Sequence, residues 1–183
     1  RRPLQQGFDH FFGLLGGNHH YFEHMDRIGV ADLWLGTEPV QRNGYTTDLI
    51  AEDAIQFMEA HQQEPFFLYV SHASPHFPWQ GPGDCEKVIK PRHKYCQQGD
   101  RETYIAMVER MDAGIGEVLA RIREAGLEDR TVVVFTSENG GHTWSRNEPL
   151  RGAKASIWEG GVRVPCIARW PGVLPAGKTV ATV

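Results

Sequence analysis

The sequence lacks three features that would assign it to common classes of protein. None of its 183 residues belongs to an apolar run of about 18, so no membrane-spanning helix is predicted. Three cysteines are too few for a scaffold built on disulfides. The 19 basic and 23 acidic residues give a net charge of -4, which argues against a protein that binds nucleic acid by neutralising phosphates. Internal repeats and low-complexity tracts are also missing.

What remains is the composition of an ordinary globular protein, with 40% hydrophobic and 23% charged residues. The length fits one domain or a large piece of one. The chain begins at Arg1 without a methionine and ends at Val183 in an apolar stretch, so we expect an internal part of a longer protein. Nine histidines and 20 glycines suggest loops with functional roles.

The cysteines leave the redox compartment open. Cys85 and Cys96 lie in a polar, loop-like segment, where they either pair or stay free, because sequence alone cannot supply disulfide geometry. Cys166 lies in an apolar run, so we expect a buried thiol there.

Periodicity predicts alternating helices and strands after an irregular start. Apolar residues at helical spacing indicate two amphipathic helices, and short β-branched or aromatic runs indicate strands. The predicted elements are an irregular segment over 1–44, a helix over 46–61 capped by Thr46 or Thr47, a buried strand over 66–70, a polar loop over 71–100, a helix from Arg101 to a stop at Gly126, and strands over 131–136 and 164–169.

A strand, a helix and a second strand in succession predict a right-handed βαβ unit with parallel strands. The expected fold class is therefore α/β, a mostly parallel sheet flanked by helices, incomplete at both ends. In such sheets the ligand site lies beyond the carboxyl ends of the strands. Three segments are then expected on one rim: 71–79, 137–142 and the loop around Lys154.

Each of these segments has a functional and an ordinary interpretation. His72 and His76 sit in a proline-rich loop, where a histidine can act as general acid or bind an anion, or simply be exposed. Glu138 and Asn139 are hard-oxygen donors suited to Ca²⁺ or Mg²⁺, or form an ordinary polar turn. Lys154 and Arg151 can bind a sulfate or phosphate, or are solvated basic residues. Separately the three signals are weak.

Their order and spacing together resemble the type I, formylglycine-dependent sulfatases of the alkaline-phosphatase superfamily, and the arylsulfatases in particular. The resemblance runs nearly from end to end, and its last block is specific to the family. It is carried by residues 7–13 (GFDHFFG), 45–48 (YTTD), 65–72 (PFFLYVSH), 75–78 (PHFP), 135–141 (FTSENGG), 150–154 (LRGAK) and 159–165 (EGGVRVP).

The resemblance implies a role for each matching position. His76 matches the histidine that contacts the sulfate and helps protonate the leaving alcohol, and Lys154 matches the lysine that binds the sulfate oxygens. Asn139 matches a ligand of the divalent cation, usually Ca²⁺ rather than Mg²⁺, and Glu138 stands where the family normally has Asp. Arg151 is assigned to substrate binding. His72 and Glu159 match motif positions with supporting roles.

Part of the family's active site is missing from the sequence. The family's nucleophile is a Cys or Ser in a Cys/Ser-X-Pro-X-Arg motif, oxidised to formylglycine, and none of the three cysteines stands in that context. We therefore expect residues 1–183 to be the central part of one sulfatase catalytic domain, with formylglycine in a preceding part. The chain alone is expected to be inactive.

The expected function is hydrolysis of a sulfate monoester, on a sulfated small molecule or a glycan, by an extracytoplasmic enzyme. The alternatives are a phosphodiesterase or phosphonate hydrolase of the same superfamily, and a non-catalytic remnant that binds anions or glycans. The stretch from His19 to Trp34 either lines a sugar-binding cleft or forms a small satellite core around Tyr21, Phe22 and Trp34; the core is the favoured interpretation.

Overall fold

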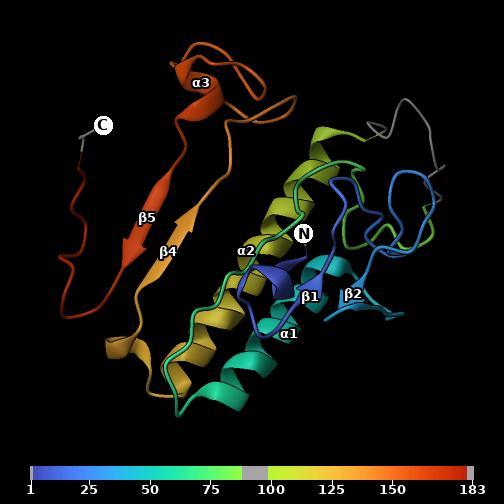
Figure 1. The fold of residues 1–183 in the computed structure, drawn as a ribbon. Helices are drawn as coiled ribbons and strands as arrows, with labels where there is room; N and C mark the ends of the chain where they lie inside the picture. Colours follow the sequence, from blue (N-terminus) through green and yellow to red (C-terminus); the bar gives the residue numbers. More distant parts are fainter. Residues whose placement is uncertain (1, 88–98, 181–183) are drawn as a thin grey trace. The chain divides into compact units, whose positions relative to one another are not determined.

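The computed structural model describes residues 2–87 and 99–180. Contacts within the chain divide it into two compact units, one up to Arg121 and one from Ile122. In chain order the elements are η1 (Pro3–Gln6), β1 (Phe12–Gly13), β2 (Trp34–Leu35), β3 (Glu38–Pro39), α1 (Thr46–His61), α2 (Arg101–Glu124), η2 (Glu128–Arg130), β4 (Val133–Thr136), α3 (Glu159–Val162) and β5 (Cys166–Arg169) (Figure 1).

Both long helices have the bounds that the periodicity predicts. The N-cap of α1 is Tyr45 rather than a threonine, because Thr46 is already the first helical residue. After α2, Gly126 takes a left-handed φ of 66°. Its N–H donates to the carbonyl of Arg123 and that of Leu127 to Ile122, both at 3.0 Å, the hydrogen bonds of a Schellman stop. In the described part of the chain, no helix is both long and apolar enough to cross a membrane.

Helices α1 and α2 run side by side in the same direction (Figure 1). The Arg110 guanidinium binds Asp48 at 2.5 Å near the start of α1, and further along both helices an ion pair joins Glu59 to Arg121. Between these pairs the helices approach closely: a Cβ added to Gly114 would lie 3.2 Å from the Cβ of Ala51. The glycine therefore permits the parallel contact.

The buried strand predicted at 66–70 is wrong. This segment is in no strand, and alternate side chains point to solvent, with Phe67 and Tyr69 76% and 69% exposed. A strand needs a hydrogen-bonded neighbour, and no strand among the described residues pairs with it. The predicted parallel βαβ pairing is accordingly not formed among these residues, whose strand pairs are all antiparallel.

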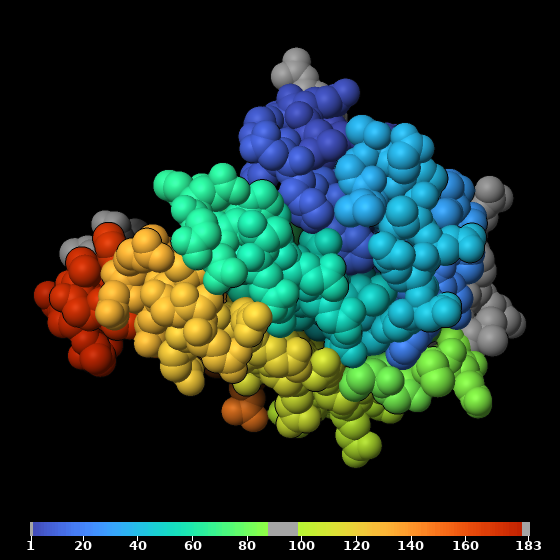
Figure 2. Space-filling view, turned by 90° about the horizontal axis from the view of Figure 1, so that it is seen from below, coloured from blue at the N-terminus to red at the C-terminus, as the bar shows by residue number. Residues whose placement is uncertain are grey.

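Residues 2–44 are largely irregular, as predicted, around a three-stranded antiparallel sheet of two-residue strands. Strand β1 contacts α1, and Figure 2 shows the blue N-terminal residues against the teal residues of that helix. The side chains of Tyr21 and Leu33 are 1% and 0% exposed. The ring of Tyr21 stacks on Tyr45 with centroids 5.2 Å apart. This burial supports the satellite core over a sugar-binding cleft.

The second unit is built on the antiparallel pair β4–β5, with Val133 opposite Arg169 and Thr136 opposite Cys166. The thiol of Cys166 is exposed, so its predicted burial is wrong: β5 is exposed along its whole length, because the pair forms a two-stranded sheet. Cys85 is exposed as well. Cys96 lies outside the described residues, so the disulfide stays an open prediction.

Candidate active site

The loop that carries His76 is tied to the helices of the first unit. The hydroxyl of Ser74, which is buried, donates to the carbonyl of Met107 in α2 at 3.1 Å. The N–H of His76 donates to the carbonyl of Ala73 at 2.8 Å, closing a turn. The backbone around His76 is therefore held by a buried anchor and a local turn.

One hydrogen bond determines the tautomer of the His76 ring, that is, which ring nitrogen carries the hydrogen. Its Nδ1 lies 2.8 Å from the carbonyl oxygen of Phe77. A carbonyl only accepts, so Nδ1 carries a hydrogen, and Nε2 is the nitrogen left to exchange a proton with a ligand. The Phe77 ring lies beside the imidazole, with centroids 4.3 Å apart, and restricts its rotation. This is the arrangement that a general acid requires.

His72 differs from His76 in its surroundings. Both of its ring nitrogens are buried and have no hydrogen-bond partner among the described residues. Burial lowers the pKa of His72 below its usual value, because desolvation disfavours the charged ring. A neutral ring suits the supporting role that the sequence predicts for it.

In the second unit, three of the predicted site residues meet. Glu138 and Asn139 lie just after β4, beyond Ser137, and the ammonium of Lys154 lies 3.3 Å from Oε1 of Glu138. The side-chain amide of Asn139 donates to the same oxygen. The structure therefore brings together two of the three predicted segments, although 16 positions separate Glu138 from Lys154.

The loop of Glu138 and Asn139 meets the loop of Lys154 at a junction that glycines make possible, because backbone packs directly on backbone there. The N–H of Gly140 donates to the carbonyl of Gly161 at 3.0 Å, and that of Gly160 to Arg151 at 2.7 Å. A Cβ on Gly140 would collide with the carbonyl of Gly160, and one on Gly160 with the carbonyl of Gly152. Any side chain at Gly140 or Gly160 would push the two loops apart.

Sequence reasoning missed Asn147, which locks the same junction. Its Oδ1 accepts from the N–H of Gly141 at 2.8 Å and its Nδ2 donates to the Gly141 carbonyl at 2.9 Å. That carbonyl also accepts from the backbone N–H of Lys154 at 3.1 Å. A lone asparagine in a polar loop does not indicate such hydrogen bonds from the sequence, so only the folded structure reveals them.

Arg151 and Glu159 lie beside the junction. The guanidinium of Arg151 stacks 3.7 Å over the ring of Trp158, a cation–π contact that leaves its charge at the surface. Glu159, the first residue of α3, pairs at 3.5 Å with Arg163, the C-cap of that helix. The substrate-binding role of Arg151 stays a prediction.

The donor set fits a hard divalent cation only in part. Glu138 and Asn139 supply a carboxylate and an amide oxygen, the kind of ligand that Ca²⁺ takes. The Glu138 side chain is 79% exposed, so its carboxylate is accessible to a cation. Within residues 2–87 and 99–180, no group of three or more His, Cys, Asp or Glu is placed to hold a metal. Further ligands would have to come from elsewhere.

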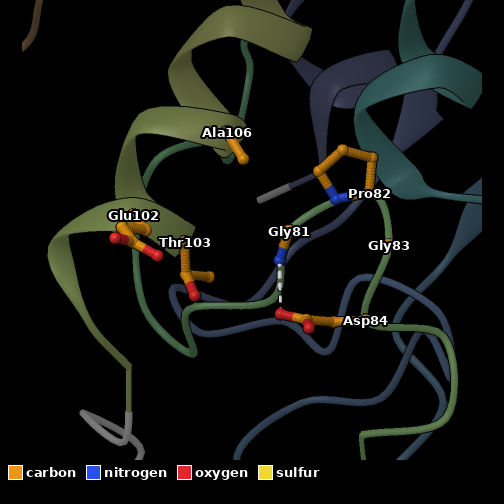
Figure 3. Close-up of a pocket in the computed structure, with 7 residues that line it drawn as sticks. All are labelled: Gly81, Pro82, Gly83, Asp84, Glu102, Thr103 and Ala106. Atoms are coloured by element: carbon orange, nitrogen blue, oxygen red, sulfur yellow. Dashed lines mark hydrogen bonds between the residues drawn. The ribbon is translucent and has the colours of Figure 1, made fainter.

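An open cavity of about 290 Å³ lies in the first unit (Figure 3). Two of its lining residues are joined by a hydrogen bond, in which the carboxylate of Asp84 accepts from the N–H of Gly81 at 2.9 Å. Its lining residues include none of the predicted site residues; they are Gly81, Pro82, Gly83, Asp84, Glu102, Thr103 and Ala106. The cavity gives no ground for a functional assignment.

The two parts of the site belong to different units. His76 lies in the first and Lys154 in the second, so their predicted proximity stays a prediction.

Comparison with known proteins places these features in one family. The sulfatase family model matches residues 2–183. Mouse (Mus musculus) steryl-sulfatase is 36% identical over 161 residues, which cover 82% of this chain and 24% of that protein. Mouse arylsulfatase J is 32% identical over 171 residues, 88% of this chain and 28% of that protein. This chain thus spans about a quarter of the length of these curated relatives.

Solved structures agree with the sequence comparison. The crystal structure of Ps i-CgsB in complex with k-i-k-neocarrahexaose is 31% identical to this chain, with a TM-score of 0.81. The superposition covers 96% of this chain and 42% of that one. The expected α/β fold class of the alkaline-phosphatase superfamily is therefore confirmed, and with the match over residues 2–183 the chain belongs to the sulfatase family.

Proposed function

We propose that this chain is the central part of a sulfatase catalytic domain that hydrolyses a sulfate monoester. The observation that carries the proposal is the junction of the second unit, where Lys154, Glu138 and Asn139 meet on a glycine-built frame. The Lys154 ammonium can bind the oxygens of a sulfuryl group. The two hard-oxygen donors beside it, on Glu138 and Asn139, can hold the divalent cation that pairs with the sulfate.

Each residue is proposed to act on a different part of the charge that develops during cleavage. Cleavage of a sulfate ester develops negative charge on the sulfuryl oxygens and on the bridging oxygen. The Lys154 ammonium binds the sulfuryl oxygens as a point charge, with Arg151 as a second anion-binding group. His76, protonated at Nε2, gives its proton to the leaving alcohol, while its Nδ1 hydrogen bond to Phe77 holds the ring in place.

Glu138 and Asn139 would hold the divalent cation, for which we propose Ca²⁺. When bound, the cation neutralises charge on the sulfate. Ca²⁺ accepts irregular coordination better than Mg²⁺, which favours it at a site where a glutamate supplies the carboxylate. The nucleophile, proposed to be formylglycine, lies outside this sequence, and the isolated chain should accordingly release no sulfate.

The substrate class is a sulfated small molecule or a sulfated glycan, handled outside the cytoplasm. Relatives named steryl-sulfatase and arylsulfatase favour the former, and the complex of Ps i-CgsB with k-i-k-neocarrahexaose favours the latter. Hydrolysis of a phosphate ester is the second candidate function, because a lysine point charge discriminates poorly between sulfate and phosphate.

Paired assays on the full-length protein test the proposal. An aryl sulfate should be hydrolysed faster than the aryl phosphate with the same leaving group. Lys154→Ala should lower kcat/KM for the sulfate about 100-fold, while Lys178→Ala, which changes an exposed lysine of the same unit, should leave it unchanged. Preference for the phosphate would support the second candidate. Turnover of neither ester, or no effect of Lys154→Ala, would contradict the proposal.

A further inference from the structure

The buried tyrosine of the N-terminal segment contacts the loop that carries His76. The side chain of Tyr21 is 1% exposed, and its hydroxyl donates to the backbone carbonyl of His76 at 2.9 Å. The two residues are 55 positions apart in the chain.

Two further hydrogen bonds fix the position of Tyr21 itself. Its N–H donates to Oε1 of Gln80 at 2.8 Å, and its carbonyl accepts from the hydroxyl of Thr46, at the start of α1, at 2.9 Å. Gln80 is fully buried, and its carbonyl accepts from the hydroxyl of Tyr45 at 2.7 Å. Tyr21 therefore joins the first turn of α1 to both ends of the segment 76–80.

We infer that Tyr21 is a positioning residue, which sets the orientation of the His76 imidazole for proton transfer to the leaving group. The inference rests on the proposed function, because it needs His76 to be the proton donor. It adds a role for a residue that has no contact of its own with the reacting atoms.

Two consecutive carbonyl groups connect Tyr21 to the orientation of the His76 imidazole. The carbonyl of His76 is held by Tyr21, and the carbonyl of Phe77 is held by Nδ1 of the His76 ring. The ring is thus bonded to a peptide group whose neighbour is anchored in the core. Loss of the Tyr21 hydroxyl leaves the His76 carbonyl without that donor, so the backbone must shift to regain a partner, and Nε2 moves with it.

The Tyr21 hydroxyl keeps the proton with which it donates this hydrogen bond. Burial raises the pKa of Tyr21 well above its usual value, because the phenolate form would be desolvated. Tyr21 therefore stays protonated through the pH range in which a histidine exchanges its proton.

The test compares two conservative variants of the full-length protein. Tyr21→Phe removes the hydroxyl that holds His76 and keeps the ring that stacks on Tyr45. Tyr45→Phe is the matched control, because it removes a buried hydroxyl that donates to Gln80 in the same segment. Each is assayed on a nitrophenyl sulfate, whose leaving group needs no proton, and on an alkyl sulfate, whose leaving group does.

Tyr21→Phe should lower kcat for the alkyl sulfate roughly tenfold, with KM unchanged and with kcat for the nitrophenyl sulfate within about twofold of the wild type. Tyr45→Phe should leave the ratio of the two rates at its wild-type value. Equal losses on both esters, or the same altered ratio in Tyr45→Phe, would show a merely structural role and overturn the inference.

A double-mutant cycle with His76→Ala decides whether the effect passes through the imidazole. In the His76→Ala background, Tyr21→Phe should cause no further loss on the alkyl sulfate; an undiminished loss would overturn the inference. Where His76→Ala slows the alkyl sulfate and Tyr21→Phe does not, the inference alone fails. Where His76→Ala slows neither ester, the proton-donor role in the proposed function fails, and the inference with it.

Discussion

At the scale of single residues, Glu138 is the clearest departure from the family pattern that the sequence resembles, in which an aspartate stands at this position. The extra methylene extends the reach of the carboxylate, and Oε1 lies 3.3 Å from the ammonium of Lys154. That contact is compatible with a carboxylate shared between a cation and the lysine. It makes Glu138 the residue at which the proposed cation site is best tested.

In the full-length protein, Glu138→Gln should weaken Ca²⁺ binding at least about tenfold, because it removes the negative charge from a site with few ligands in this chain. Glu138→Asp should retain binding, because it keeps the carboxylate. Isothermal titration with Ca²⁺ measures both. Unchanged affinity in both variants would show that this carboxylate does not bind the cation.

Buried histidines in the N-terminal segment should make the protein less stable in acid. His20 is 1% exposed, and neither ring nitrogen has a hydrogen-bond partner in the described parts of the chain. Burial lowers the pKa of His20 and of His24 in the folded state. The unfolded chain therefore takes up protons first as the pH falls, so this stability is present above about pH 6.5 and is lost progressively below it.

His20→Phe should reduce that pH dependence by removing one of the buried titrating groups. The free energy of unfolding, measured by urea denaturation between pH 5 and 8, should change less steeply with pH, by at most about 1.4 kcal/mol per pH unit. His142→Phe, at an exposed histidine, should leave the slope unchanged. A wild-type slope in His20→Phe would mean that His20 is not a source of the acid sensitivity.

At the scale of elements, the parallel pair α1–α2 depends on a glycine at its contact point. Gly114→Ala should destabilise the protein by about 1–3 kcal/mol, because the new methyl group would press on Ala51. Gly116→Ala, two residues along the same helix and in open space, should stabilise it by about 0.5–1 kcal/mol. Thermal melting of the two variants should therefore shift in opposite directions; equal shifts would rule out the close contact.

The helices were the elements best predicted from sequence, because their apolar spacing records which face is buried. Strand 131–136 was also found, although β4 begins only at Val133. The strand prediction for residues 66–70 was wrong for a physical reason. An apolar run indicates burial, but a strand also needs a hydrogen-bonded neighbour, and the local sequence does not specify one. Pairing within the sheets lay beyond prediction for the same reason.

At the scale of the whole molecule, the candidate site was predictable where its residues are close in sequence. Glu138, Asn139 and Lys154 lie on neighbouring loops, and the structure brings them together. The roles of Tyr21 and Asn147 were not predictable, because both side chains bind backbone groups. Almost every residue has the same backbone groups, so the sequence does not indicate which of them a side chain will bind. A site that depends on such contacts is visible only in the folded chain.

The proposed function requires His76 of the first unit and Lys154 of the second to act on one sulfate group. The most direct test is a crystal structure of the full-length protein with inorganic sulfate bound. Nε2 of His76 and Nζ of Lys154 should both lie within hydrogen-bond distance of the sulfate, and therefore within about 8 Å of each other. A sulfate bound by Lys154 with His76 on the opposite face of the sheet would contradict it.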